Sequence, residues 1–206
     1  MSSGLYKRLF EICYKHKLHH LGSYFSCLDL IDLIYDEMRD EDIFILSCGH
    51  AVVALYVVLE KYYGFDAEEL LCDHGEHPKL DELRKIYCST GSLGMGLPVA
   101  VGRAIGDTER RVYCLISDGE CAEGSIWEAL QFIRNNNMGN IEIHVNANGF
   151  SAYDKIDLDY LEARLKSFCP DIKFHRTTVE HLPFLKDIDA HYYSMKPEDI
   201  KYMERL

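Results

Sequence analysis

The stretch that decides the fold is Arg110–Asp154, RRVYCLISDGECAEGSIWEALQFIRNNNMGNIEIHVNANGFSAYD. Its pattern predicts a buried strand over 112–116, a tight turn over 117–119, a helix over 120–136 and a second buried strand over 141–145. A strand, a helix and a strand in this order form one βαβ crossover, whose two strands lie parallel. We therefore predict a three-layer α/β/α fold with a mostly parallel central sheet.

Polar side chains follow both predicted strands. Asp118 comes after the first strand and Asn148 after the second, so both lie at the carboxyl edge of the sheet, where open α/β folds usually bind ligands. A carboxylate, an amide oxygen and a free carbonyl just beyond Asn148 suit octahedral Mg²⁺ completed by water and phosphate oxygens. Gly119 lets the backbone approach a phosphate, and the amides ahead of the next helix favour an anion. These features predict a metal-bridged diphosphate, although an S-D-G turn alone is more often a simple strand exit.

This stretch resembles the thiamine diphosphate signature of the transketolase family, in which a G-D-G is followed further along the chain by an Asn. The resemblance implies that Asp118, Asn148 and the carbonyl of Phe150 hold Mg²⁺ or Ca²⁺ against the diphosphate of the cofactor. The first Gly of the motif is Ser117 in this chain. That departure places a Cβ and a hydroxyl beside the diphosphate.

Length and composition are those of a globular chain, with the size of one large α/β domain or two small ones, and we expect one domain. The chain has 206 residues, of which 48% are hydrophobic and 27% charged, so it can bury a core as one domain spanning residues 1–206. A net charge of −12 argues against a nucleic acid partner, because no basic stripe is present to neutralise phosphates. Eight cysteines without a signal peptide fit a reducing cytoplasm. The longest apolar run, 51–59, is too short to span a membrane.

The amino-terminal part carries two further matches to the family. A helix is predicted from Leu5 to about 17, then an H-L-G-S turn with His20, then a helix that begins near Ser26 and buries Leu30, Leu33 and Ile34. The resemblance implies that His20 reaches the substrate. A short strand over 43–46 opens on S-C-G-H-A before a helix over 51–62, and the resemblance places His50 against the diphosphate. A solvated loop for His20 and a buried structural His50 are the simpler alternatives.

The segment 72–96 carries two more matches. His77-Pro78 stands where the family has H-P-E, with Lys79 in place of the Glu, which implies that His77 contacts substrate hydroxyls. S-T-G-S-L-G-M-G precedes a helix over 97–105 and is close to the family's cofactor loop, which implies that Gly91 and Leu93 border the cofactor rings. The cysteines and histidines over 72–88 also invite a zinc interpretation, but their spacing lacks a second paired ligand set.

The remaining matches are weaker. Glu123 matches a family Glu that faces its mate across a subunit interface and belongs to the cofactor site. Beyond residue 154 we predict a helix with a Leu158, Leu161, Leu165 and Phe168 stripe, a strand over 172–177 and a last helix over 197–206. The FLKDIDAHYY segment over 184–193 loosely matches a family motif, which implies that His191 is a diphosphate neighbour.

A second chain is expected on the same grounds. In the family the carboxylic acid that activates thiamine diphosphate belongs to a separate pyrimidine-binding domain, and too few residues follow Asn148 to form one. The resemblance therefore implies one half of a split transketolase. Its catalytic Glu would lie on a partner subunit, in a heterotetramer of two of each chain.

The activity that the resemblance implies is transfer of a two-carbon ketol unit from a ketose to an aldose, with His20 and His77 as catalytic residues. Two alternatives stay open. The chain could serve a 2-oxo-acid decarboxylating or acyl-transferring enzyme, or it could be a non-catalytic regulatory subunit that kept the fold.

Overall fold

The computed structural model describes residues 3–203 and is built on a parallel sheet of four strands in the order β1-β2-β3-β4. Each strand pairs in parallel with the next one along the chain. The α/β class and the parallel sheet predicted from the sequence are confirmed. The strands are β1 (Ile43–Leu46), β2 (Val112–Ser117), β3 (Ile141–Ala147) and β4 (Lys173–Arg176).

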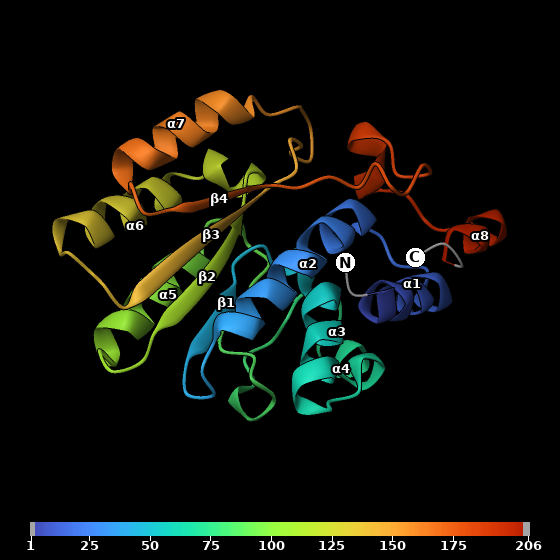
Figure 1. Cartoon of the computed structure of the whole chain (residues 1–206), viewed down its shortest axis with the longest axis horizontal. Helices are drawn as coiled ribbons and strands as arrows, with labels where there is room; N and C mark the ends of the chain where they lie inside the picture. Colours follow the sequence, from blue (N-terminus) through green and yellow to red (C-terminus); the bar gives the residue numbers. More distant parts are fainter. Residues whose placement is uncertain (1–2, 204–206) are drawn as a thin grey trace.

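Helices cover both faces of the sheet (Figure 1). On one face lie α1 (Ser3–His16), α2 (Leu21–Glu37), α3 (Val52–Tyr63) and α4 (Ala67–His74). On the other face lie α5 (Gly96–Gly106), α6 (Gly124–Asn135) and α7 (Leu158–Phe168). The result is the predicted arrangement of three layers with the sheet in the middle.

Strand β1 shows why the sheet needs both layers. All four of its residues are buried, since alternate side chains of a strand point to opposite faces. Phe44 and Leu46 pack in the core on the α1–α4 side, and Ile43 and Ile45 pack in the core on the α5–α7 side. A run of apolar residues without alternation is therefore the pattern of a parallel strand covered on both sides.

The second helix differs from its prediction. It begins at Leu21 rather than near Ser26, and Ser26 is buried inside it, where its hydroxyl donates to the carbonyl of Ser23. Burial of Leu21 and its neighbours against the core extends the helix by more than a turn, so tertiary packing overrides the capping signal. Leu33 is 45% exposed, because the buried face runs through Ile31 and Ile34 instead.

The helix predicted over 120–136 also starts later. A 3₁₀ turn, η3 (Gly119–Ala122), follows β2, and α6 begins only at Gly124. A similar short turn, η1 (Gly49–Ala51), follows β1 and directly precedes α3, whereas η2 (Glu82–Arg84) lies within the loop between α4 and α5. The turns after β1 and β2 therefore lie directly at the carboxyl edge of the sheet, ahead of the helices.

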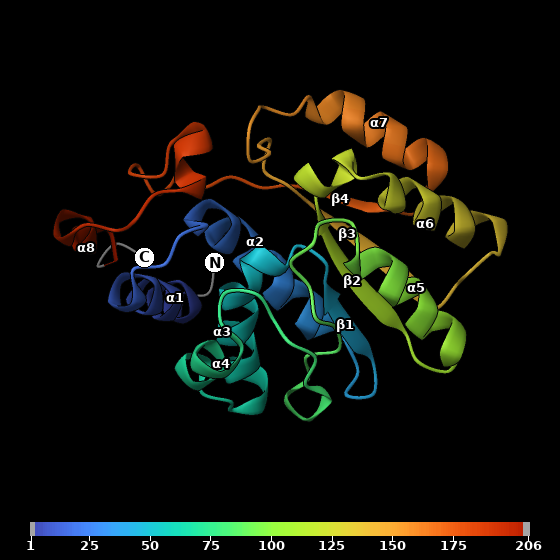
Figure 2. The ribbon, with the colours of Figure 1, turned by 180° about the vertical axis from the view of Figure 1, so that it is seen from behind.

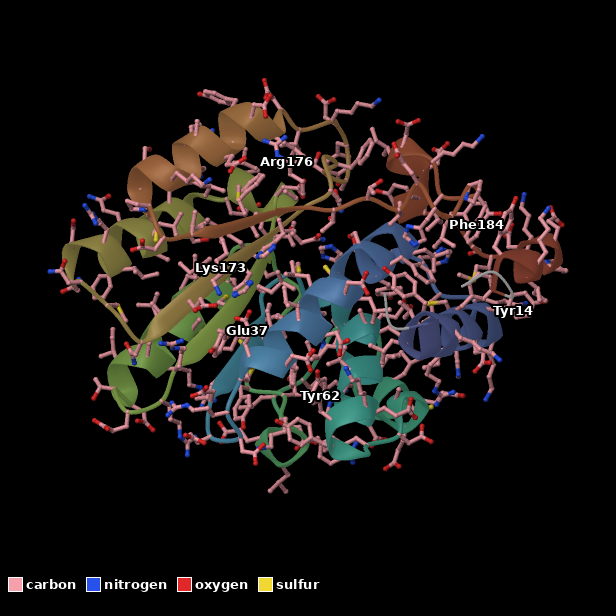
Figure 3. The ribbon with its side chains drawn as sticks, in the orientation of Figure 1. Tyr14, Glu37, Tyr62, Lys173, Arg176 and Phe184 are labelled. Carbon is pink, nitrogen blue, oxygen red and sulfur yellow. The ribbon has the colours of Figure 1, made fainter. Side chains whose placement is uncertain are left out.

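The C-terminal segment crosses from β4 back to the α1 side of the molecule (Figure 1). It contains η4 (Asp187–His191), η5 (Pro197–Asp199) and α8 (Ile200–Met203), so the predicted last helix begins with a 3₁₀ turn, and residues 204–206 lie outside the described part. Phe184 lies against α1, with its ring centroid 6.1 Å from that of Phe10 (Figure 3). No helix within residues 3–203 combines the length and the apolar character needed to cross a lipid bilayer.

Candidate functional site

The loops that leave β1, β2 and β3 meet at the carboxyl edge of the sheet around a cavity of about 370 Å³. This cavity collects residues that are far apart in the sequence. It is lined by every predicted site residue except His191: His20, His50, His77, Gly91, Leu93, Asp118, Gly119, Glu123, Asn148 and Phe150. The side chain of His191 lies outside the part of the chain that the structure describes; its backbone ends η4.

Asp118 is a buried carboxylate at the end of β2. One of its oxygens accepts a hydrogen bond from the amide of Gly149 at 2.7 Å, and the other accepts one from the amide of Gly119 at 2.9 Å. Burial raises the pKa of Asp118 to about 7, against the effect of these two hydrogen bonds. Within residues 3–203 no charged side chain pairs with Asp118, so a bound divalent cation fits the place and would keep the carboxylate ionised.

The loop after β3 supplies the other two predicted ligands. Gly149 adopts a φ of +86°, a conformation that glycine tolerates best, and it turns the chain back so that the amide of Phe150 donates to the Asn148 side-chain oxygen at 2.9 Å. That oxygen keeps a second lone pair for a ligand. The Phe150 carbonyl oxygen lies 3.8 Å from the point where a Cβ on Gly119 would be. The two loops that carry the predicted ligands are therefore in contact.

Ser117, where the family motif has Gly, lines the cavity. Its hydroxyl accepts a hydrogen bond from the amide of Glu120 at 3.2 Å, and the side chain is buried. The hydroxyl thus caps the 3₁₀ turn η3. The serine that replaces the family's glycine therefore has a structural role, because its hydroxyl accepts from the Glu120 amide.

The three predicted histidines form one wall of the cavity. His20 precedes α2 with a left-handed backbone (φ 60°), and its carbonyl accepts from the amides of Ser23 and Tyr24. A non-glycine residue rarely adopts this conformation, and such strain is common at functional sites. The His20 ring centroid lies 5.6 Å from that of His50 and 6.3 Å from that of His77.

Two glycines let the loop between α4 and α5 close over the sheet edge, where Figure 2 shows it crossing in front of β1. A Cβ on Gly49 would lie 2.6 Å from the carbonyl carbon of Thr90, so only glycine allows the two backbones to approach. Gly91 has a φ of +152°, and a Cβ there would lie 2.9 Å from the His77 ring. Gly91 therefore makes room for His77, a role that its position in the motif does not reveal.

Glu123 is exposed, borders the cavity and precedes the first residue of α6.

A zinc cluster over 72–88 has no support: among the described residues there is no group of three or more His, Cys, Asp or Glu placed to hold a metal ion. The predicted magnesium set contains only one residue of those four types.

Sequence reasoning missed two buried residues at this edge. Glu120 was expected to start a helix, but its carboxylate is completely buried and accepts from Ser47, Gly94 and Ser117. Asn146 lines the cavity, and its side-chain amide donates to the Ser26 hydroxyl at 2.9 Å. Their place in the sequence, two residues after Asp118 and two residues before Asn148, was the available signal.

Curated relatives of the chain include several transketolases. It is 41% identical over 144 residues to a subunit of the apulose-4-phosphate transketolase of Phocaeicola vulgatus, an alignment that covers 60% of this chain and 50% of that protein. It is 34% identical over 151 residues to human transketolase, covering 68% of this chain and 24% of that protein. The chain thus spans half or less of the length of these relatives.

Solved transketolase structures share the fold. The structure from Campylobacter jejuni matches with a TM-score of 0.76 at 19% identity, covering 98% of this chain and 41% of that chain. A variant from Pichia stipitis in complex with fructose 6-phosphate matches with a TM-score of 0.78 at 18% identity, covering 99% and 40%. At these identities the likeness concerns the fold.

The match that bears on the family covers most of the sheet. The model of the family described as transketolase, thiamine diphosphate binding domain, matches residues 34–169. These residues run from the end of α2 through α7 and include Asp118, Asn148 and Phe150. The chain therefore belongs to the transketolase family, of which it carries the thiamine diphosphate-binding domain.

Proposed function

We propose that the chain is the diphosphate-binding subunit of a thiamine diphosphate-dependent transketolase that transfers a two-carbon ketol unit from a ketose to an aldose. The observation that carries this proposal is the cavity at the carboxyl edge, where Asp118, Asn148 and Phe150 face three histidines from other segments. The Phocaeicola relative supports it, because that protein is itself one subunit of a transketolase. We treat residues 1–206 as one cofactor-binding domain.

The proposed metal is Mg²⁺, or Ca²⁺ in its place. Asp118, the Asn148 oxygen and the Phe150 carbonyl would hold it, with water and diphosphate oxygens completing the shell. The amide of Gly119 and the ring of His50 would contact the diphosphate, and His191 is a proposed neighbour. Leu93 and the backbone of Gly91 would border the cofactor rings, and Glu123 would complete the cofactor site at the subunit interface. When bound, thiamine diphosphate supplies the carbanion stabilisation that breaking a bond beside a ketose carbonyl requires.

His20 and His77 are the proposed catalytic residues. An imidazole titrates near neutrality, so it can both donate a proton to and accept a proton from a sugar hydroxyl during the transfer. The closeness of the two rings lets both reach one bound sugar. Hydroxyl-bearing substrates fit such a wall better than a 2-oxo acid does.

A partner subunit is part of the proposal. It would carry the pyrimidine-binding domain and the catalytic Glu, and two copies of each chain would form a heterotetramer. The substrate class to test first is a sugar phosphate, after the name of the Phocaeicola relative. The proposed location is the cytoplasm, since all eight cysteines are free thiols, which suits a reducing compartment.

The experiment compares the chain alone with the chain co-expressed with the product of a neighbouring reading frame of pyrimidine-domain size. With thiamine diphosphate and Mg²⁺ present, we expect ketol transfer from a ketose donor only by the pair. Robust transfer by the chain alone would remove the need for a partner. Turnover of pyruvate in place of the ketose would support the decarboxylating alternative. Cofactor binding without any turnover would support a regulatory role.

A further inference from the structure

Glu120 is a buried carboxylate to which three separate segments donate hydrogen bonds. It is 0% exposed. One of its oxygens accepts from the Ser47 hydroxyl at 2.6 Å and from the Gly94 amide at 2.8 Å. The other oxygen accepts from the Ser117 amide at 3.1 Å. We call this group of four residues the carboxylate clasp.

The clasp uses neutral donors alone. Among the ion pairs formed by residues 3–203 none includes Glu120, and the hydrogen bonds to its carboxylate come from Ser47, Gly94 and Ser117. Burying a carboxylate without a cationic partner is costly, and hydrogen bonds from several donors are the means by which proteins offset that cost. Burying a carboxylate here carries a desolvation free energy that a leucine or an alanine at this position would not incur.

Each donor belongs to a segment that borders the cavity. Ser47 precedes the turn that carries His50, and Ser117 precedes Asp118. Gly94 follows Leu93 in the glycine-rich loop. The carboxylate therefore lies where three segments meet: the turn 47–50, the turn 117–119 and the glycine-rich loop 89–96.

The loop is also fixed from its other side. Gly94 has a φ of +79°, and a Cβ there would lie 2.7 Å from the Cβ of Glu123 and 2.5 Å from the Ser125 hydroxyl oxygen. The Ser125 hydroxyl donates to the Gly94 carbonyl at 2.8 Å. Both backbone polar groups of Gly94 are thus bonded to the segment 120–125, so the position of the loop depends on that segment.

We infer that Glu120 is a positioning residue for the cofactor: its carboxylate holds the glycine-rich loop 89–96 against the turns that carry His50 and Asp118. It does so without touching the cofactor or substrate. This inference rests on the proposed function, because it assigns the three loops to thiamine diphosphate. It explains why a charged residue follows Asp118 and Gly119 in a fully buried place.

The test uses the isosteric variant Glu120→Gln and the partial variant Ser47→Ala, with Glu109→Gln as the matched control. An amide cannot accept at its nitrogen, so Glu120→Gln sets a donor against at least one N–H or O–H of the clasp. Ser47→Ala removes one donor and leaves the other two. Glu109 is exposed and lies before β2, away from the carboxyl edge.

Two quantities are measured. Hydrogen–deuterium exchange of the full chain reports local opening, and we expect exchange over 89–96 to rise about 10-fold or more in Glu120→Gln, less in Ser47→Ala and not at all in Glu109→Gln. Calorimetric titration of the assembled complex is expected to show thiamine diphosphate affinity reduced about 10- to 100-fold, as for other residues that support a metal site.

The outcomes separate the inference from the proposed function. Unchanged exchange over 89–96 would overturn the clasp, and so would a rise of equal size throughout the sheet, which would mark a merely stabilising residue. If Glu120→Gln fails to fold, the same comparison is made with Ser47→Ala. If the wild-type complex binds no thiamine diphosphate while the loop shows strong protection, the proposed function fails and the clasp remains as a structural device.

Discussion

Polar residues lie at both ends of β3, but they differ in where their partners are. Beyond the carboxyl end, Asn148 lines the cavity beside Asp118, whose carboxylate accepts from backbone amides and has no cationic partner within residues 3–203. At the amino end, Glu142 and His144 find their partners inside the chain. A polar group whose partners are supplied by the protein contributes to stability, whereas a polar group that lacks such a partner is available to a ligand.

The amino end is a closed cluster of charges and rings. One ring nitrogen of His144 lies 2.8 Å from the Glu142 carboxylate, and the other lies 3.1 Å from a ring nitrogen of His175. Lys173 of β4 contacts Glu142 at 2.5 Å and Glu37 of α2 at 3.4 Å, and Figure 3 shows Lys173 and Glu37 on neighbouring elements. This cluster ties β3 and β4 to the end of α2.

The strongest effect should come from the carboxyl end. In Asp118→Asn the cation loses a charged ligand, so we expect thiamine diphosphate and Mg²⁺ affinity of the assembled complex to fall on the order of 10³-fold, more than the roughly 10- to 100-fold cost of losing an outer partner. Calorimetric titration measures it, with the exposed Asp40→Asn as control.

The same variant tests whether Asp118 serves binding rather than folding. Because burial raises the pKa of Asp118 to about 7, the ionised carboxylate destabilises the ligand-free fold at higher pH. The melting temperature of ligand-free Asp118→Asn should therefore equal or exceed that of the wild type at pH 8. A large decrease would place Asp118 with the stabilising residues of the amino end.

A more moderate effect is expected from the histidine wall. His20→Asn and His77→Asn should each lower kcat for ketol transfer by the assembled enzyme on the order of 10²-fold, the usual cost of a lost acid–base group. His19→Asn is the matched control, since His19 is exposed, adjacent in sequence and outside the cavity. A loss below about threefold in both test variants would make the wall a binding surface without a role in proton transfer.

The cluster at the amino end should make the stability of the fold depend on pH. Burial lowers the pKa of His144, despite its contact with Glu142, and burial also lowers the pKa of His175. Both rings are therefore harder to protonate in the folded chain than in the unfolded chain, so the unfolded chain takes up more protons as the pH falls below about 6.5, the ordinary value. The contribution of the two rings to the free energy of unfolding is fully present above about pH 6.5. It decreases as the pH falls, by up to about 1.4 kcal/mol per pH unit for each ring.

Urea unfolding between pH 5 and 8 measures this slope. His175→Gln should reduce the slope on the acid side, and an identical slope in the two proteins would contradict the assignment.

Lys173→Met should have the weakest effect, a loss of at most about 1 kcal/mol in the free energy of unfolding, because its ion pairs are partly exposed. Together the two variants compare the histidine pair and the ion pairs of one cluster.

Much of the fold followed from local sequence. Apolar runs such as Ile43–Leu46 identify parallel strands because both faces of the sheet are covered, and β1 has the bounds that the run predicts. The start of α2 did not follow, because Leu21 joins the helix through burial in the core rather than through a capping residue. A short-range signal cannot report a contact with a distant segment.

For the candidate site, the residue types at the strand ends could be read without a structure. Asp118, Asn148 and the histidines could be named because ligand chemistry restricts a position to a few side chains. The folded chain was needed to show that Gly91 makes room for His77, that Glu120 turns inward and that His144 meets His175. Each of these depends on segments brought together by the sheet, and the contacts that fix them are between residues far apart in the chain.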